Sequence, residues 1–191
     1  MISTRVVTLT RIFGPADPVW GIDLQVEPPN SNWGRDDIDR WVTEGWNSVP
    51  NKSDVFLIAA LWIPGYGYTM SSSPNAYKAS RDILIHNGEA LAPAWSQKVE
   101  ERENASGADP GFHAEDGACF LYEKSLQKKL GAIDTYPSTA TNKPYMVVYG
   151  RRWVGAAPGF VATCAKGKKG GSQLNPDCSW VMSELGIDVK L

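Results

Sequence analysis

The tripeptide His113-Ala114-Glu115 is the part of the sequence with the clearest capacity for chemistry. An imidazole is a common metal ligand, and a carboxylate beside a bound metal can take up and release protons. We expect both residues in the first turn of one helix, with the glutamate roughly 200° around the axis from the histidine. The spacing predicts a hydrolytic metal site in which His113 is a ligand and Glu115 is acid and base. The next residue, Asp116, is expected to stabilise the helix start.

The other candidate ligands are three cysteines. Cys178 stands where Asn175-Pro176-Asp177 begins a predicted helix. Cys164 follows a predicted strand and precedes a loop rich in glycine and lysine, and such a loop can fold away from a metal while its ends return to it. Cys119 is expected on a different helix face from His113, in the core, and is held in reserve as a ligand. The alternatives to metal binding are core packing for Cys178 and an incidental loop thiol for Cys164.

Residues 110–191 resemble the zinc-dependent cytidine deaminase-like superfamily, in which His-x-Glu is followed by Pro-Cys-x-x-Cys at the start of another helix. Phe112-His113-Ala114-Glu115-Asp116 reproduces the first half of that pattern, and a strand before the cysteine-bearing helix fits its order of elements. The second half differs, because Cys178 has no second cysteine one turn later. The resemblance implies a Zn²⁺ site formed by His113, Cys164 and Cys178, with Glu115 as the catalytic acid and base.

The activity implied by this resemblance is hydrolytic deamination of a nucleobase, with cytosine in single-stranded nucleic acid as the expected substrate. Family members also act on adenine, on guanine and on free nucleosides or nucleotides, and the residues do not separate these substrates. A second hypothesis is a binding module that keeps the fold but lacks a competent metal site. The missing second cysteine after Cys178 is consistent with this hypothesis. A third is a protein that binds a ligand such as a sugar on platforms formed by its eight tryptophans and seven tyrosines.

Basic and aromatic residues near the predicted site are candidates for substrate binding. Arg151, Arg152 and Lys168 could contact the phosphates of a nucleotide or strand, together with Lys166 and Lys169. Trp153 could stack on a base. The structural alternatives are a solvated lysine-rich loop and simple packing, and core positions are expected for Trp33, Trp41, Trp46 and Trp62.

Periodicity and turn signals predict the elements that must position these residues. Residues 54–63 have the composition and length of a buried central strand, and residues 143–150 predict a second one. Helices are expected from 36 or 37 to 46, across 76–103 with a break at Pro93, from 113 to 130, and from 175 to 185. Shorter strands are expected up to residue 11, around 21–26 and at 187–191, with a long loop at 65–75. This order predicts an α/β protein. The resemblance implies, more specifically, a three-layer deaminase-like α/β/α sandwich with a central mixed sheet.

Length and composition limit the number of domains, the binding partners and the cellular location that we expect. The 191 residues fit one domain spanning 1–191, without a linker or internal repeat. A net charge of -2 gives no overall attraction to phosphate, so nucleic-acid binding would need a local basic patch. The odd cysteine count disfavours a disulfide scaffold. No signal peptide is visible and no apolar run reaches the roughly 20 residues of a bilayer span. We therefore expect a cytoplasmic protein or a delivered effector such as a toxin domain, with no membrane partner.

Overall fold

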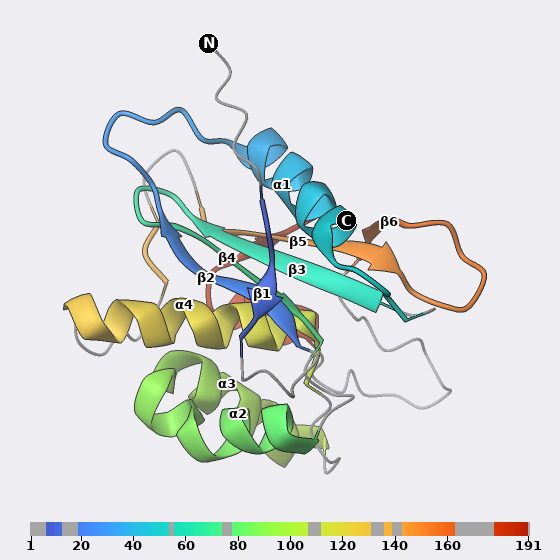
Figure 1. Ribbon diagram of the computed structural model, residues 1–191. Helices are drawn as coiled ribbons and strands as arrows, with labels where there is room; N and C mark the ends of the chain where they lie inside the picture. The colour runs from blue at the N-terminus through green and yellow to red at the C-terminus, as the bar shows by residue number, and fades with distance from the viewer. Residues whose placement is uncertain are drawn as a thin grey trace.

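The computed structural model describes residues 7–12, 19–53, 56–73, 78–106, 112–130, 136–138, 143–162 and 178–190 (Figure 1). Five helices and seven strands are found within these residues. Their order is β1 (Thr10–Arg11), β2 (Trp20–Val26), α1 (Arg35–Ser48), β3 (Phe56–Ile63), β4 (Gly67–Ser72), α2 (Lys78–Leu91), α3 (Pro93–Ser106), α4 (Ala114–Leu130), β5 (Tyr145–Arg151), β6 (Gly159–Val161), α5 (Cys178–Glu184) and β7 (Asp188–Val189).

The seven strands form one mixed sheet in the order β1-β2-β4-β3-β5-β6, with β7 also paired to β5 (Figure 1). The β5–β7 pair is parallel and the other pairs are antiparallel. β3 lies at the centre, where Ala59 is opposite Ser71 of β4 and Val148 of β5. β6 and β7 lie along the same edge of β5, because β7 pairs with its first residues and β6 with its last.

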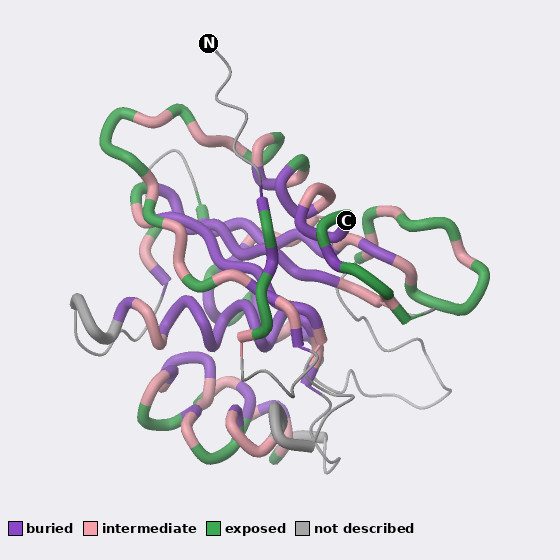
Figure 2. The backbone as a smooth tube through the Cα atoms, in the orientation of Figure 1, coloured by how far each residue is buried: buried purple, intermediate pink, exposed green. Residues whose placement is uncertain are grey.

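Helices cover both faces of this sheet. On one face α1 packs Trp41 and Trp46 against Trp62 of β3 in one buried apolar cluster. On the other face α4 packs Phe120 into a second cluster that includes Val181 of α5. α2 and α3 lie against the side of α4 that faces away from the sheet (Figure 1). The predicted α/β/α sandwich with a central mixed sheet is confirmed, and Figure 2 shows its buried backbone concentrated in the central strands and in α4.

The loop predicted at residues 65–75 is wrong, because Gly67–Ser72 is the fully buried strand β4 between β2 and β3. A tight turn with Gly65 at φ 81° separates β3 from β4. The small polar residues that suggested a loop satisfy their hydrogen bonds internally. The Thr69 hydroxyl donates to the Ala118 carbonyl of α4 at 2.9 Å, and the Ser72 hydroxyl accepts the Trp20 backbone N–H at 2.9 Å. The alternation of Tyr68 and Met70 with Thr69 and Ser71 was the available signal for a strand.

The predicted helices are present within the described residues, whereas the starts expected at residues 76 and 175 lie outside them. Pro93 is the first residue of α3. A proline is tolerated in the first turn of a helix, but it cannot continue the preceding helix, so α2 ends before it. Gly186, at φ 74°, ends α5 in a Schellman motif in which the Ile187 N–H donates to the Met182 carbonyl at 2.8 Å. The strand predicted up to residue 11 is a strand only at Thr10–Arg11 within the described part, and β6 was not predicted. No helix within the described residues is both long enough and apolar enough to cross a bilayer.

Candidate metal centre

Two hydrogen bonds hold the start of α4 in place. The carboxylate of Asp116 accepts the backbone N–H of His113, the residue before the helix, at 2.8 Å. This is one half of a capping box, and it satisfies a donor that the helix itself leaves unpaired. The hydroxyl of Ser73, just after β4, donates to the Phe112 carbonyl at 3.3 Å. The stabilising role predicted for Asp116 at the helix start is therefore visible in its contacts.

The fold brings His113 and Cys178 together, although 65 residues separate them in the chain. His113 Nδ1 lies 3.0 Å from Cys178 Sγ. Cys178 is the first residue of α5 and is only 2% exposed, whereas His113 is partly exposed. Two of the three metal ligands expected from the sequence thus converge at the starts of two helices.

Asp116 completes a group that could hold a metal ion, since one ligand atom each of His113, Asp116 and Cys178 lies within 4.8 Å of the others. Both carboxylate oxygens of Asp116 already have protein partners. Its Oδ2 accepts the His113 N–H, and its Oδ1 accepts the indole N–H of Trp95 at 3.1 Å. These bonds fix the orientation of the carboxylate, and each oxygen keeps a second lone pair that could bind a metal.

The donor set and its spacing fit a zinc ion. Imidazole nitrogen and thiolate sulfur are ligands that zinc prefers, and tetrahedral bonds of ~2.0 Å to nitrogen and ~2.3 Å to sulfur hold these atoms about 3.5 Å apart. The observed separation of 3.0 Å between His113 Nδ1 and Cys178 Sγ needs only a small opening to reach this value.

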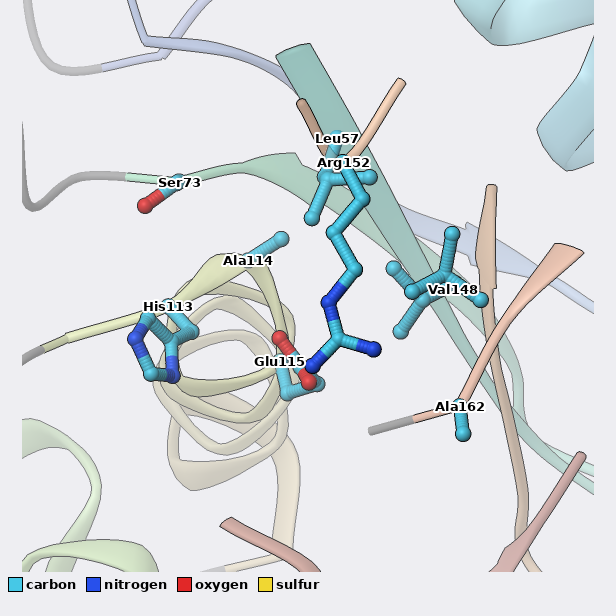
Figure 3. A pocket seen from close by; sticks show the side chains of 9 residues that line it. Leu57, Ser73, His113, Ala114, Glu115, Val148, Arg152 and Ala162 are labelled. Carbon is cyan, nitrogen blue, oxygen red and sulfur yellow. The ribbon is translucent and has the colours of Figure 1, made fainter. Parts of the chain in front are cut away.

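Glu115 stands beside this group, on the wall of a pocket of about 50 Å³. Glu115 is 3% exposed, and a glutamate is almost never buried to this extent unless it is paired. His113 lines the same pocket, as does Arg152, which follows β5. Figure 3 shows the Glu115 carboxylate, from α4, and the Arg152 guanidinium, from the segment after β5, both directed into this pocket.

A second pocket, of about 230 Å³, adjoins the first and shares Arg152, Val161 and Ala162 with it. It lies at the β5–β6 hairpin, and the rings of Trp153 and Phe160 are among its walls. Trp153 is 62% exposed, so its ring face is accessible to a ligand. Two of the predicted substrate-binding residues, Arg152 and Trp153, therefore border cavities next to the candidate metal centre.

Other candidates from the sequence lie elsewhere. Arg151 lines neither pocket: its guanidinium lies over the Trp46 ring, 5.7 Å from the centroid, and donates to the Ser53 carbonyl at 3.1 Å. Cys119 is in the core, with its Sγ 3.8 Å from Met182 Sδ, and burial raises the pKa of its thiol well above the usual value. Cys164 and Lys168 lie outside the residues that the structure describes.

The sequence reasoning missed Arg102 of α3. This side chain is buried, and its Nη1 lies 3.7 Å from Cys178 Sγ. A signal was present, because Trp95, Val99 and Arg102 follow one another at spacings of four and three, which places a charge on the apolar face of a helix. The spacing gives no indication of the thiol it contacts, since Cys178 is 76 residues away.

Comparison with known proteins assigns no family. No protein-family model matches the chain, nor does any curated protein or solved structure. Residues and geometry alone carry the interpretation of the site.

Proposed function

We propose that this chain is a zinc-dependent hydrolase that deaminates a nucleobase, with cytosine in single-stranded nucleic acid as the substrate. The observation that carries the proposal is the 3.0 Å approach of His113 Nδ1 to Cys178 Sγ, with Glu115 in the same helical turn as the histidine. A zinc ion held there would supply a Lewis acid that activates water near neutral pH. His113 and Cys178 would bind it, and Cys164 is the expected third protein ligand.

Glu115 is positioned to move the protons of such a reaction. Deamination replaces the exocyclic amino group of the base with the oxygen of water and releases ammonia. The proton that leaves the attacking water must reach the departing nitrogen, and a carboxylate on the pocket wall can carry it. The burial of Glu115 keeps bulk water away from that transfer.

Arg152 and Trp153 support a substrate with phosphates and bases. Arg152 lies at the boundary of the two pockets, where a guanidinium can contact a phosphate of a strand that enters the first pocket. The exposed ring of Trp153 offers a stacking surface for a second base. These residues give the local attraction that the net charge of -2 does not provide.

The proposal is tested by zinc quantification and a deamination assay on single-stranded DNA, RNA and cytidine. Wild type should hold one zinc, and His113→Ala and Cys178→Ala should lose most of it. Cys119→Ser is the matched control, because this thiol packs in the core against Met182 and is not in the His113, Asp116 and Cys178 group, so its zinc content should be that of wild type. Retention of zinc in both ligand variants would show that the metal centre is misplaced.

The Glu115→Ala variant separates catalysis from metal binding. It should keep its zinc and lose at least a hundredfold in turnover, which is the low end for removal of a general acid–base catalyst. Deamination at the wild-type rate by this variant would contradict the mechanism. A related free nucleoside activity would appear as turnover of cytidine at a rate equal to or above that of the oligonucleotides.

A binding module without turnover is the second candidate, and the size of the inner pocket favours it. About 50 Å³ is well below the ~300–1,000 Å³ of typical ligand pockets, so a nucleobase would enter only if the walls move apart. Saturable binding of single-stranded nucleic acid, with no zinc in the purified protein and no turnover, would favour the module over the enzyme.

A further inference from the structure

Arg102 is a buried cation next to the candidate metal centre. It lies on α3 and is 7% exposed. Its Nη1 is 3.7 Å from Cys178 Sγ and 3.9 Å from Asp116 Oδ1, and within the described residues its Nη2 has no hydrogen-bond partner. Burying a guanidinium is costly unless anionic groups compensate it, and among the described residues these two neighbours are placed to do so.

The same contacts join three helices. Arg102 and Trp95 approach Asp116 from α3, Asp116 lies in the first turn of α4, and Cys178 begins α5. Asp116 in turn fixes the backbone of His113. Arg102 therefore reaches both proposed ligands, His113 through Asp116 and Cys178 directly.

The chemistry of the side chain suits this place. The planar guanidinium presents several N–H groups in a fixed fork, so it can face a thiolate and a carboxylate together, whereas a lysine ammonium is a point charge on a flexible stem. Groups that hydrogen-bond to metal ligands orient them, and their removal commonly weakens metal binding 10- to 100-fold.

We propose that Arg102 is a positioning residue of the metal centre, which donates an N–H to the Cys178 thiolate and thereby holds its sulfur toward His113. This inference rests on the proposed function, because it requires that His113 and Cys178 bind zinc. Arg102 contacts the ligand and not the metal, so its removal weakens binding without eliminating the site.

The test compares zinc affinity by chelator competition in wild type, Arg102→Gln and Arg102→Lys. The expected affinity loss is about 10- to 100-fold for Arg102→Gln, with a smaller loss for Arg102→Lys, which keeps the charge and one donor group. The matched control is Lys98→Gln, one turn earlier on α3, whose ammonium pairs with Glu101 at 2.8 Å and not with Cys178. Its affinity should equal that of wild type.

Replacing zinc with cobalt gives an absorption band that would not shift if Arg102 only stabilised the fold. An N–H donor on a thiolate lowers the energy of the sulfur lone pairs, so the sulfur-to-cobalt charge-transfer band of Arg102→Gln should shift to longer wavelength than in wild type. The Lys98→Gln band should stay in place. If Arg102→Gln does not fold, Arg102→Lys decides: weaker affinity with a shifted band supports the proposal.

The outcomes separate this inference from the proposed function. One zinc in wild type, with affinity and band unchanged in the Arg102 variants, overturns the role of Arg102 and leaves the metal centre standing. The absence of any stoichiometric metal in wild type overturns both.

Discussion

At the scale of single residues, the first turn of α4 directs adjacent side chains to different surroundings. Glu115 lines the inner pocket, while Asp116 points to α3, where it accepts the Trp95 indole N–H. Successive helical residues lie about 100° apart, which is why neighbours in sequence reach different surroundings. One carboxylate thereby lines the pocket, and the other supports the start of α4 and its contact with α3.

Glu123, two turns further along α4, is a buried carboxylate of a different kind. It accepts the backbone N–H groups of Ala94 and Trp95 at 3.0 and 2.8 Å, and the Tyr136 hydroxyl at 2.7 Å. Two of these bonds satisfy backbone N–H groups in the first turn of α3 that have no partner within the helix. Burial raises the pKa of Glu123 to about 7, because desolvation outweighs these hydrogen bonds.

The raised pKa of Glu123 predicts a specific pH dependence of stability. Between about pH 4.5 and about pH 7 the folded chain keeps a proton that the unfolded chain releases, so this group's contribution to stability falls as the pH rises through that window. The loss is about 3 kcal/mol at most. Relative to wild type, Glu123→Gln should gain stability from pH 5 to pH 8 in urea unfolding, because the amide does not ionise.

Glu101→Gln is the control for that measurement. Glu101 is partly exposed and a hydrogen bond from Lys98 lowers its pKa, so its removal should give no gain in stability with rising pH. Parallel stability curves for wild type and Glu123→Gln across this range would show that Glu123 is ionised throughout.

At the scale of elements, the close approach of α4 to β4 places the candidate site. Gly117 has no room for a side chain, since an added Cβ would lie 2.2 Å from Ser71 Oγ and 2.8 Å from Ser71 Cβ. The Thr69 hydroxyl bonds to the Ala118 carbonyl at the same contact. The small residues of β4 thus let the helix that carries His113 and Glu115 lie directly on the sheet.

This contact predicts that Gly117→Ala destabilises the fold. Overpacking costs about 1–3 kcal/mol, against which the better helix propensity of alanine offsets up to about 1 kcal/mol. Ser71→Gly should relieve the clash, so the double variant should be at least about 1 kcal/mol more stable than the two single effects predict. Gly159→Ala, where nothing lies within 4 Å of the added carbon, should change stability little. Simple additivity in chemical unfolding would contradict the contact.

The sequence predicted those elements whose signals are local. Pro93 separates α2 from α3, Gly186 ends α5, and the apolar run of β3 forms the sheet centre. β4 was mistaken for a loop because its serines and threonine become buried only through the tight packing of α4, which no local pattern reveals. The sequence pointed to His113, Glu115 and Cys178 as candidate site residues. It did not point to the contact of Arg102 with Cys178, because that contact depends on how three helices meet.

At the scale of the whole molecule, the candidate site opens toward one edge of the sheet. β6 continues the sheet beyond β5, and the turn between them carries Trp153. The inner pocket with Glu115 and the outer pocket with Trp153 meet at Arg152. Arg151, one residue earlier, lies over Trp46 of α1, which covers the opposite face of the sheet from α4. The two adjacent arginines at the end of β5 therefore lie in different surroundings, one against α1 and the other between the two pockets.

This arrangement predicts separable roles for charge and stacking in the binding of a single strand. In a Glu115→Ala background, which prevents turnover, Arg152→Ala should lower the slope of log affinity against log salt by about 0.7, the value for one phosphate contact. Trp153→Ala should leave that slope unchanged but cost about 1–3 kcal/mol of binding, because it removes one stacked base. Arg151→Ala, whose guanidinium already donates to Ser53, should do neither. Fluorescence anisotropy with a labelled oligonucleotide measures all three, and equal salt slopes for the two arginine variants would show that the strand does not cross the β5–β6 edge.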